Sequence, residues 1–338
     1  MESKPLISEV RPGAAITGGE IFIRGTGFRF LNGHRPRVNF GDVEGAVVIS
    51  SENFLVAKVP EGAISGEVTI NIGDQRSDAH AFEVAVAIAD NLHPVANPVL
   101  DQQGNIYATF SGSRGQKAPV SIYKIDLNYT VKPFVTQMMN PTGMAFDREG
   151  QLHVSSRHDG TVYRVAPNGS FSTYVEGMGI ATGIAFDEED NLYVGDRSGT
   201  IFKISPERQI FVFATLEPSI AAYHLAFGPQ GYLYVTGPTT SSFDCVYRVS
   251  RNGEVGVFYR GLGRPQGMAF DAHGNLYVAA SLEGRKGIVR LTPEARAELA
   301  VSGGGLVGLA FLGRALLLAS SNSLYYLNWT AKGRPLLG

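Results

Sequence analysis

The sequence predicts an all-β protein with two parts, a small N-terminal β-sandwich followed by a six-bladed β-propeller. Three observations predict it: 41 glycines among 338 residues without a collagen-like period, a motif that recurs from about residue 95 onward, and a different set of short apolar runs before that point. A high glycine content with many short β-type runs is typical of folds that are dense in tight turns. We place the sandwich in residues 1–86 and the propeller in residues 87–338.

The sandwich is predicted from about seven short β-type runs separated by Gly, Pro and Asn turns. The clearest runs lie at residues 7–10, 18–28, 38–42, 54–60, 66–72 and 81–84. Their order, PLISEVRPG…GGEIFIRGTGF…VNFG…VP…F, closely resembles the IPT/TIG domain, which has an immunoglobulin-like fold. The resemblance implies a non-catalytic spacer or docking module. The stretch 85–94 is short and apolar, so we expect the sandwich to pack against the propeller.

The propeller is predicted from six copies of one motif at intervals of about 40 residues. The copies are residues 141–147 (PTGMAFD), 181–187 (ATGIAFD), 222–228 (AYHLAFG) and 265–271 (PQGMAFD), with weaker ones at 306–312 (LVGLAFL) and 95–101 (VANPVLD). A turn and three further strands follow the clear copies, and four antiparallel strands of this length form one blade. The competing interpretation is a linear solenoid, which would need capping repeats, and the chain ends at residue 338 soon after the sixth copy. We expect residues 85–94 or 334–337 to supply the outer strand of the closing blade.

The pattern P-x-G-[MI]-A-F-D…G-x-L-Y-V…R-V, over roughly residues 90–338, resembles NHL-repeat propellers. It is also similar to the propellers of the gluconolactonase/regucalcin and strictosidine-synthase-like groups, which share the fold across enzymes and binding proteins. In the gluconolactonase/regucalcin group, the residues before the first-strand glycines contribute Asn and Asp ligands to a divalent cation. In this chain the ring at that position consists of Ala96, Thr142, Thr182, Tyr223, Gln266 and Val307.

This ring has no carboxylate, so we predict no metal site and no catalytic residue there. A hard cation needs several charged oxygens, and activation of water or a lactone needs a general base beside the metal. We therefore predict a non-enzymatic ligand- or protein-binding propeller without a cofactor. The alternative is a gluconolactonase-like, metal-dependent lactone hydrolase with a non-standard site, and only that alternative implies Ca or Zn. Two lesser interpretations are a streptogramin-lyase type of enzyme, with His158 or His224 as a loose match for its histidine, and a structural role in a larger assembly.

Ligands of propellers usually bind at the mouth of the channel, here surrounded by the loops between strands 2 and 3 and between consecutive blades. We expect a small polar ligand or a protein partner there. Arg157, Asp196 and Arg197 occupy such loops in adjacent blades, where two guanidinium groups could hold an anionic or sugar-like ligand. The competing interpretation is that these loops are solvated hairpin turns. The candidate ligand-binding residues are Thr142, Arg157, Thr182, Asp196, Arg197, Tyr223, His224 and Gln266.

Departures from the repeat give further indications. Tyr223 and His224 interrupt it and could gate the channel, stack on a ligand or only fill the space. His153 stands where other blades have Tyr, and we interpret it as a packing variant. The longest loops of this face are predicted at residues 111–118, 237–244 and 281–287. Insertions on one face often mark the binding side, with neutral drift as the competing interpretation.

Composition and motif searches exclude several classes of function. The net charge is −2 with both signs spread along the chain, which gives no basic surface for nucleic acid or an anionic membrane. No run approaches the roughly 18 apolar residues of a membrane-spanning helix. Cys245 is the single cysteine, so no intrachain disulfide and no cysteine-based zinc site can form. Residues 1–5 lack the apolar region of a signal peptide, so we expect a cytoplasmic protein as the sequence stands, or an exported one if a leader was removed.

Overall fold

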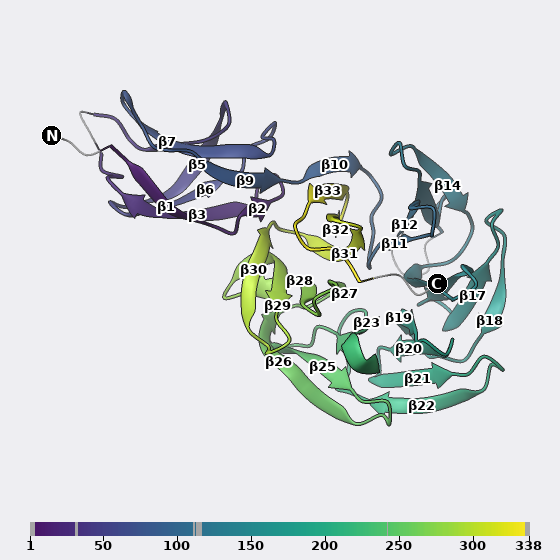
Figure 1. Cartoon of the computed structure of the whole chain (residues 1–338). Helices are drawn as coiled ribbons and strands as arrows, with labels where there is room; N and C mark the ends of the chain where they lie inside the picture. The colour runs from purple at the N-terminus through teal and green to yellow at the C-terminus, as the bar shows by residue number, and fades with distance from the viewer. Residues whose placement is uncertain (1–3, 31–32, 111, 113–116, 242, 335–338) are drawn as a thin grey trace.

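The computed structural model describes residues 4–30, 33–110, 112, 117–241 and 243–334. The regular elements in these ranges are β-strands, apart from one 3₁₀ turn, η1 (Pro229–Gly231). Figure 1 shows two bodies: the N-terminal strands lie together as a sandwich, and the remaining strands form a ring of blades around an axis. The all-β fold class predicted from the sequence is confirmed.

The N-terminal body is built from two antiparallel sheets. One sheet has the order β1 (Leu6–Arg11), β3 (Glu20–Thr26), β6 (Phe54–Lys58) and β5 (Val43–Ser50). The other centres on β7 (Gly66–Ile72), which pairs with β4 (Arg37–Phe40), β8 (Gln75–Arg76) and β9 (His80–Val84). The short β2 (Ala14–Ala15) runs parallel to β9, and a pairing of β4 with β5 joins the two sheets at one side.

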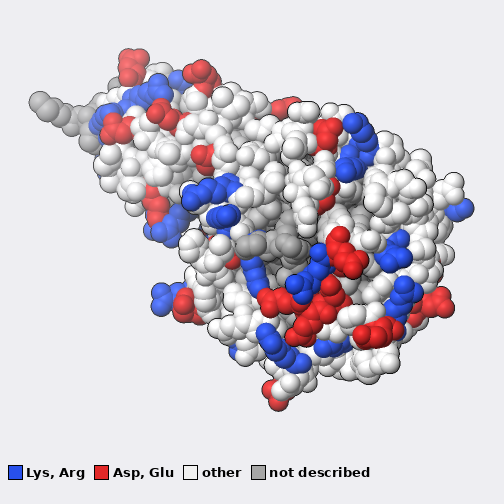
Figure 2. Space-filling model, turned by 45° about the vertical axis from the view of Figure 1, so that its right-hand side comes forward, with Lys and Arg blue, Asp and Glu red and all other residues white. Residues whose placement is uncertain are grey.

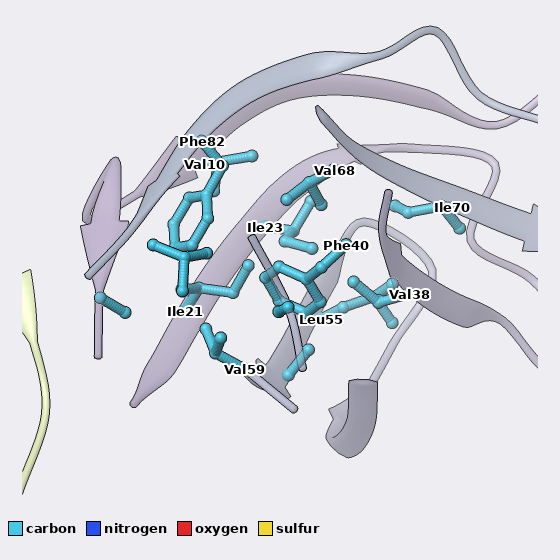
Figure 3. Packing of buried hydrophobic residues seen from close by; sticks show 14 of the residues in the cluster. Val10, Ile21, Ile23, Val38, Phe40, Leu55, Val59, Val68, Ile70 and Phe82 are labelled. Atoms are coloured by element: carbon cyan, nitrogen blue, oxygen red, sulfur yellow. The ribbon is translucent and has the colours of Figure 1, made fainter. Parts of the chain in front are cut away.

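The two sheets of the sandwich enclose one apolar core, which Figure 3 shows from close by. Ile21 and Ile23 of β3 belong to the same buried cluster as Val68 and Ile70 of β7, and all four are completely buried. Buried and more exposed residues alternate along β3, as expected for a strand with one face on the core and the other toward solvent.

The first three blades are separate four-stranded antiparallel sheets, and in each of them consecutive strands pair. Blade 1 consists of β11 (Val99–Leu100), β12 (Ile106–Thr109), β13 (Ile122–Ile125) and β14 (Val131–Val135). Blade 2 consists of β15 (Pro141–Phe146), β16 (Leu152–Ser156), β17 (Thr161–Val165) and β18 (Phe171–Val175). Blade 3 consists of β19 (Ala181–Phe186), β20 (Leu192–Asp196), β21 (Thr200–Ile204) and β22 (Ile210–Thr215).

Blades 4 and 5 are joined into one continuous sheet. Blade 4 consists of β23 (His224–Phe227), β24 (Leu233–Thr236), β25 (Asp244–Val249) and β26 (Val255–Gly263). Blade 5 consists of β27 (Met268–Phe270), β28 (Leu276–Leu282), β29 (Arg285–Leu291) and β30 (Ala297–Ser302). The long β26 reaches the next blade and pairs with β28, with Leu262 opposite Leu282.

The last blade closes the ring with a strand from the other end of the propeller sequence. It consists of β31 (Leu306–Leu312), β32 (Ala315–Ser320), β33 (Leu324–Asn328) and, as the outer strand, β10 (Val86–Ala89). Val86 pairs with Tyr326, so the first of the two predicted segments, residues 85–94, supplies this strand. Residues 335–337 of the other predicted segment lie outside the described residues.

Counted by their first strands, the described residues form six blades. Counted by unbroken hydrogen bonding they form fewer separate sheets, because β26 joins blades 4 and 5 and β2 joins blade 5 to the sandwich. The domain limits 1–86 and 87–338 remain a prediction, and the strand that closes the propeller begins at Val86.

The sandwich packs against blade 5, as the short apolar linker predicts. Ala15 of β2 pairs in parallel with Ser302 of β30, and the Ile16 N–H donates to the Ser302 carbonyl oxygen at 2.9 Å. Ile16 belongs to a buried apolar cluster with propeller residues that include Val301 and Leu306. A hydrogen-bonded strand and a shared core therefore hold the two bodies in one orientation.

One predicted loop is wrong. Residues 281–287 form a tight hairpin, with Leu282 directly opposite Arg285 in β28 and β29. Glu283 and Gly284, the two residues of the turn, have φ angles of 51° and 81°. A two-residue turn with positive φ at both positions matches the twist of the flanking strands, so the strands continue up to it and leave no long loop.

The other two predicted loops differ in what the structure describes. The predicted loop 237–244 lies between β24 and β25, with residue 242 outside the described residues. The Asp244 carboxylate accepts hydrogen bonds from the Thr239 N–H and hydroxyl. In the predicted loop 111–118, residues 111 and 113–116 lie outside the described residues.

Candidate functional site

The two ends of the propeller axis differ in structure. We call the end that carries the ring of Ala96, Thr142, Thr182, Tyr223, Gln266 and Val307 the loop end. The opposite end, where a turn leads from strand 1 to strand 2 of each blade, is called the turn end. The eight ligand-binding residues predicted from the sequence belong to the loop end.

Three predicted ring residues are buried and hydrogen-bonded within the protein. Thr142 and Thr182 are each 1% exposed. The Thr142 hydroxyl donates to a backbone carbonyl two residues earlier at 3.3 Å, and the Thr182 hydroxyl donates to the Gly195 carbonyl at 2.8 Å. Tyr223 is also 1% exposed, its hydroxyl donates to the Glu217 carbonyl, and burial raises its pKa. These side chains therefore have their hydrogen-bond partners within the protein.

The predicted charged residues tie neighbouring loops together. An Arg157 Nη2–H donates to the Gly112 carbonyl oxygen at 3.0 Å, and an Arg197 Nη2–H donates to the Ile220 carbonyl oxygen at 2.8 Å. The Asp196 carboxylate accepts one hydrogen bond from a backbone N–H at 2.8 Å and one from a neighbouring serine hydroxyl. These contacts account for all three residues as supports of the loops, and their part in ligand binding stays a prediction.

Gln266 and His224 complete the predicted set. Gln266 is half-buried, and its backbone carbonyl accepts a hydrogen bond from the Thr236 hydroxyl at 2.6 Å. His224 is 5% exposed, and among the eight predicted residues it alone lines the axial cavity. The sequence therefore predicted one residue of the cavity and placed the main binding face at the other end of the axis.

A cavity of about 550 Å³ lies between the first strands of the blades and reaches the exposed turns of the turn end. Its walls include apolar side chains of the six blades, such as Leu100, Met144, Ile184, Leu225, Met268 and Leu309. The volume falls within the range of pockets that bind small molecules.

Small residues at alternating positions of the first strands leave this space open. Alternate residues of a strand share one face, so Gly183 and Ala185 of β19 share a face. Neighbouring first strands approach so closely that a Cβ atom at Gly183 would overlap the Tyr223 carbonyl oxygen. The strands therefore require glycine at the first position, and alanine at the second position fills little of the axis.

Two blades carry polar side chains at the glycine position. Asn97 of blade 1 is hydrogen-bonded within the protein: its side-chain amide donates to the Met268 carbonyl at 2.8 Å and accepts from the Leu309 N–H at 3.0 Å. The imidazole of His224 in blade 4 makes no hydrogen bond or ion pair with any described residue. Burial lowers the pKa of His224 to about 4, so the ring is neutral near pH 7 and presents one donor and one acceptor.

The aspartates that end the first strands anchor the turns of the turn end. The Asp101 carboxylate accepts hydrogen bonds from the N–H groups of Gln103 and Asn105, from the Asn105 side chain and from the Tyr107 hydroxyl. Burial acts to raise the pKa of Asp101, but these hydrogen bonds outweigh it and the pKa is lowered. The two backbone bonds recur at Asp147, Asp187 and Asp271. The repeated carboxylate is therefore a structural element of the blade.

Three glutamates add negative charge at the mouth of the cavity: Glu149, Glu188 and Glu189. All three are exposed. The cationic residues that line the cavity are Lys203, Arg251 and Arg334. Figure 2 shows acidic and basic residues gathered near the middle of the propeller face. Six carboxylates against three cationic side chains make the mouth acidic.

The interpretation of His153 as a packing variant is confirmed. The residue is 1% exposed, and its ring packs edge-on against Tyr174 and Phe186, with centroid distances of 4.6 and 4.9 Å. Burial lowers the pKa of His153, against the opposing effect of the Asp147 carboxylate 3.7 Å away. This histidine lies within blade packing and does not line the cavity.

Within the residues that the structure describes, no group of three or more His, Cys, Asp or Glu residues could hold a metal ion. No helix among the same residues has the length and hydropathy to span a membrane.

Sequence reasoning missed the turn end, its glutamates and Arg334. The repeat did contain a signal for the cavity, since small residues alternate at the innermost positions of nearly every blade. Arg334 lies after the last repeat, so no periodic pattern marks it.

Comparisons with known proteins agree with this architecture. Residues 5–84 match the IPT/TIG domain family, and comparison of the chain with curated proteins finds no match. A solved structure described as a putative gluconolactonase has a TM-score of 0.62 and 18% identity, over 74% of this chain and 93% of that one. An auxiliary nutrient binding protein from Bacteroides thetaiotaomicron has a TM-score of 0.59 and 13% identity, over 96% of this chain and 98% of that one. A catalytically inactive virginiamycin B lyase from Staphylococcus aureus, with quinupristin, has a TM-score of 0.53 and 13% identity, over 97% and 96%.

The fold and the cavity define the class of this protein: a β-propeller with an axial cavity, carried behind an immunoglobulin-like sandwich. Its N-terminal part is an IPT/TIG domain. The propeller has the fold of the NHL/gluconolactonase-like proteins, and at identities below 20% the likeness concerns the fold alone.

Proposed function

We propose that this protein is a non-enzymatic binding protein whose propeller holds a small ligand in the axial cavity. The observation that carries the proposal is the imidazole of His224, 5% exposed and unpartnered among the described residues, in the wall of a cavity of about 550 Å³. The ring lies in the cavity wall and has no partner among the described residues, so its donor and acceptor are available to a ligand. A ligand with one polar group at that depth would satisfy the ring.

The roles of the repeated carboxylates support binding over catalysis. The aspartates at the turn end each accept at least two backbone hydrogen bonds, which hold them in their turns. A general base must reach the proton that it removes, and these groups are already engaged. The fold likeness to auxiliary nutrient binding proteins is consistent with a binding role. We assign the IPT/TIG domain the part of a spacer or docking module, held rigidly by the pairing of β2 with β30.

The test is a panel of sugars, amino acids, nucleosides, polyamines and aryl amidines, measured by thermal shift and then by calorimetry on the full chain. A ligand at 100 times its Kd stabilises the folded state by about 2.7 kcal/mol, which is readily measured. Ala226 lines the cavity, so Ala226→Phe should abolish binding by filling it. Ala87 is exposed on β10, so Ala87→Phe is the matched control and should bind normally. A panel without any binder, or binders that Ala226→Phe does not affect, would contradict the proposal.

The alternative function is metal-dependent lactone hydrolysis, and the likeness to a putative gluconolactonase is the observation in its favour. A lactonase site would bind Ca or Zn and thereby raise the melting temperature by mass action. A chelator-sensitive shift of several degrees together with turnover of gluconolactone would establish the alternative. The absence of both effects is the result we expect.

A further inference from the structure

The C-terminal arm, residues 332–334, lies at the mouth of the cavity and is fixed there by its backbone. The Gly333 N–H donates to the Gly313 carbonyl of blade 6 at 2.9 Å, and the Arg334 N–H donates to the Phe270 carbonyl of blade 5 at 3.1 Å. A Cβ atom at Gly333 would overlap the side chain of Phe311, so the arm lies directly on the ends of the first strands. These contacts place the side chain of Arg334 beside the axis.

The side chain of Arg334 extends from blade 5 toward blades 4 and 3. Its Nη1–H donates to the Phe227 carbonyl oxygen at 3.1 Å, and its Nη2 lies 3.5 Å from the Glu188 Oε1. Arg334 also lines the cavity. A guanidinium group of the protein itself therefore lies within the acidic mouth.

The contact between Arg334 and Glu188 can be exchanged for a ligand. The two side chains are 30% and 69% exposed, and ion pairs at such exposure are weak. Glu149 and Glu189 add two carboxylates at the same mouth, and no ion pair to a described residue involves either of them. A cation that replaced the guanidinium would meet the same acceptors: the Phe227 carbonyl and the glutamates.

Resting on the proposed function, we propose that the ligand of the cavity is an organic cation with an apolar body, and that Arg334 occupies the subsite of its cationic group when the cavity is free. The apolar walls would receive the body of the ligand, and the unpartnered ring of His224 would receive one further polar group. Guanidinium, amidinium and ammonium groups all fit the acceptors at the mouth.

The experiment compares benzamidine, a cation at neutral pH, with benzamide, its neutral counterpart, by calorimetry on the full chain. Arg334→Ala removes the built-in competitor, so benzamidine should bind about tenfold more tightly than to the wild type, whereas benzamide should gain nothing. Arg334→Gln, which keeps a donor for the Phe227 carbonyl without the charge, should show the same order of gain if Arg334→Ala folds poorly. Arg296 is exposed on an outer turn, so Arg296→Ala is the matched control and should leave affinity unchanged.

A second substitution tests the acceptor. Glu188→Gln in the Arg334→Ala protein should weaken benzamidine binding about fivefold, with benzamide unaffected. Equal benzamidine affinity in the wild type and in both Arg334 variants, or an equal gain for benzamide, would overturn the inference.

The two proposals fail in different ways. In one outcome, neutral or anionic compounds bind, Ala226→Phe abolishes their binding, and benzamidine does not bind. The proposed binding function would then stand, and the proposed cationic subsite would be wrong. If Ala226→Phe affects no compound of the panel, including benzamidine, both proposals are wrong.

Discussion

At the loop end of the axis, three predicted ring side chains are buried and have protein partners, whereas at the turn end a cavity reaches an acidic surface. Thr142, Thr182 and Tyr223 are each 1% exposed at the first end. Glu149, Glu188 and Glu189 are exposed at the second. The repeated strands are the same throughout, so the difference comes from the residues at the two ends of each first strand.

The polar residues at the two ends of the same repeat therefore differ in their hydrogen bonding. At the turn end, the carboxylate of the aspartate that ends the first strand accepts backbone hydrogen bonds within the turn, and the glutamates that follow it lie at the surface. At the loop end, the threonine hydroxyl groups at the positions of the predicted ligand-binding ring donate hydrogen bonds to backbone carbonyl oxygens. A polar residue beside a propeller axis is therefore a binding candidate only when its own hydrogen bonds are not already satisfied within the protein.

The largest expected effect of a substitution is at Tyr223, which is buried beside the loop end. It packs in a buried cluster with Ala185, Leu225 and Val235, so Tyr223→Ala should lower the free energy of unfolding by about 4 kcal/mol, measured by urea denaturation. Tyr223→Phe, the matched control, removes only the hydrogen bond to the Glu217 carbonyl and should cost about 1 kcal/mol. A Tyr223→Ala protein of wild-type stability would show that the packing of Tyr223 at the loop end contributes little to stability.

Most of the fold could be predicted from the sequence because its signals are periodic. Each first strand repeats the same small and apolar residues, and each repeat buries its faces only against its neighbours. The closing strand was predicted to come from one of two segments because hydrophobicity alone did not decide between them. The hairpin at residues 281–287 was missed, since a turn of Glu283 and Gly284 looks like part of a loop when its φ angles are unknown.

Less of the site could be predicted, because burial and hydrogen bonding decide it. Alignment of the repeats with one another placed Thr182 and Tyr223 beside the channel, but it could not show that their hydroxyl groups donate to carbonyls of the protein. His224 was found as an interruption of the repeat, which is the one signal that carried over to the cavity. Arg334 reaches Glu188 through a contact between segments far apart in the sequence, and no local pattern predicts such a contact.

A smaller effect is expected from the titration of His224. Burial lowers the pKa of His224 from 6.5 to about 4, so the unfolded chain binds a proton at a higher pH than the folded protein does. Burial of the neutral ring therefore lowers the free energy of unfolding in acid: the full free energy of unfolding is present above pH 6.5, and it decreases as the pH falls toward 4. Between pH 7 and pH 5 this loss should be about 2 kcal/mol, measured by urea denaturation.

The variant His224→Gln isolates this contribution, because the residue no longer titrates in either state. His153, whose pKa is also lowered by burial, titrates in both proteins and cancels in the difference. The stability of His224→Gln should therefore fall less steeply with acid than that of the wild type. Parallel curves for the two proteins would show that the ring of His224 is hydrated in the folded state, and the cavity would then be wetter than its walls indicate.

The smallest expected effect tests the comparison of the two ends most directly. Gln266 belongs to the loop-end ring, was predicted to bind a ligand and is half-buried. No hydrogen bond from its side chain to another described residue is observed. Gln266→Ala should therefore change the free energy of unfolding by less than about 0.5 kcal/mol. It should also leave the affinity for any ligand blocked by Ala226→Phe unchanged in calorimetry, since Gln266 does not line the cavity. If Gln266→Ala abolished that binding, ligands would enter from the loop end after all, and the ring predicted from the sequence would be part of the binding site.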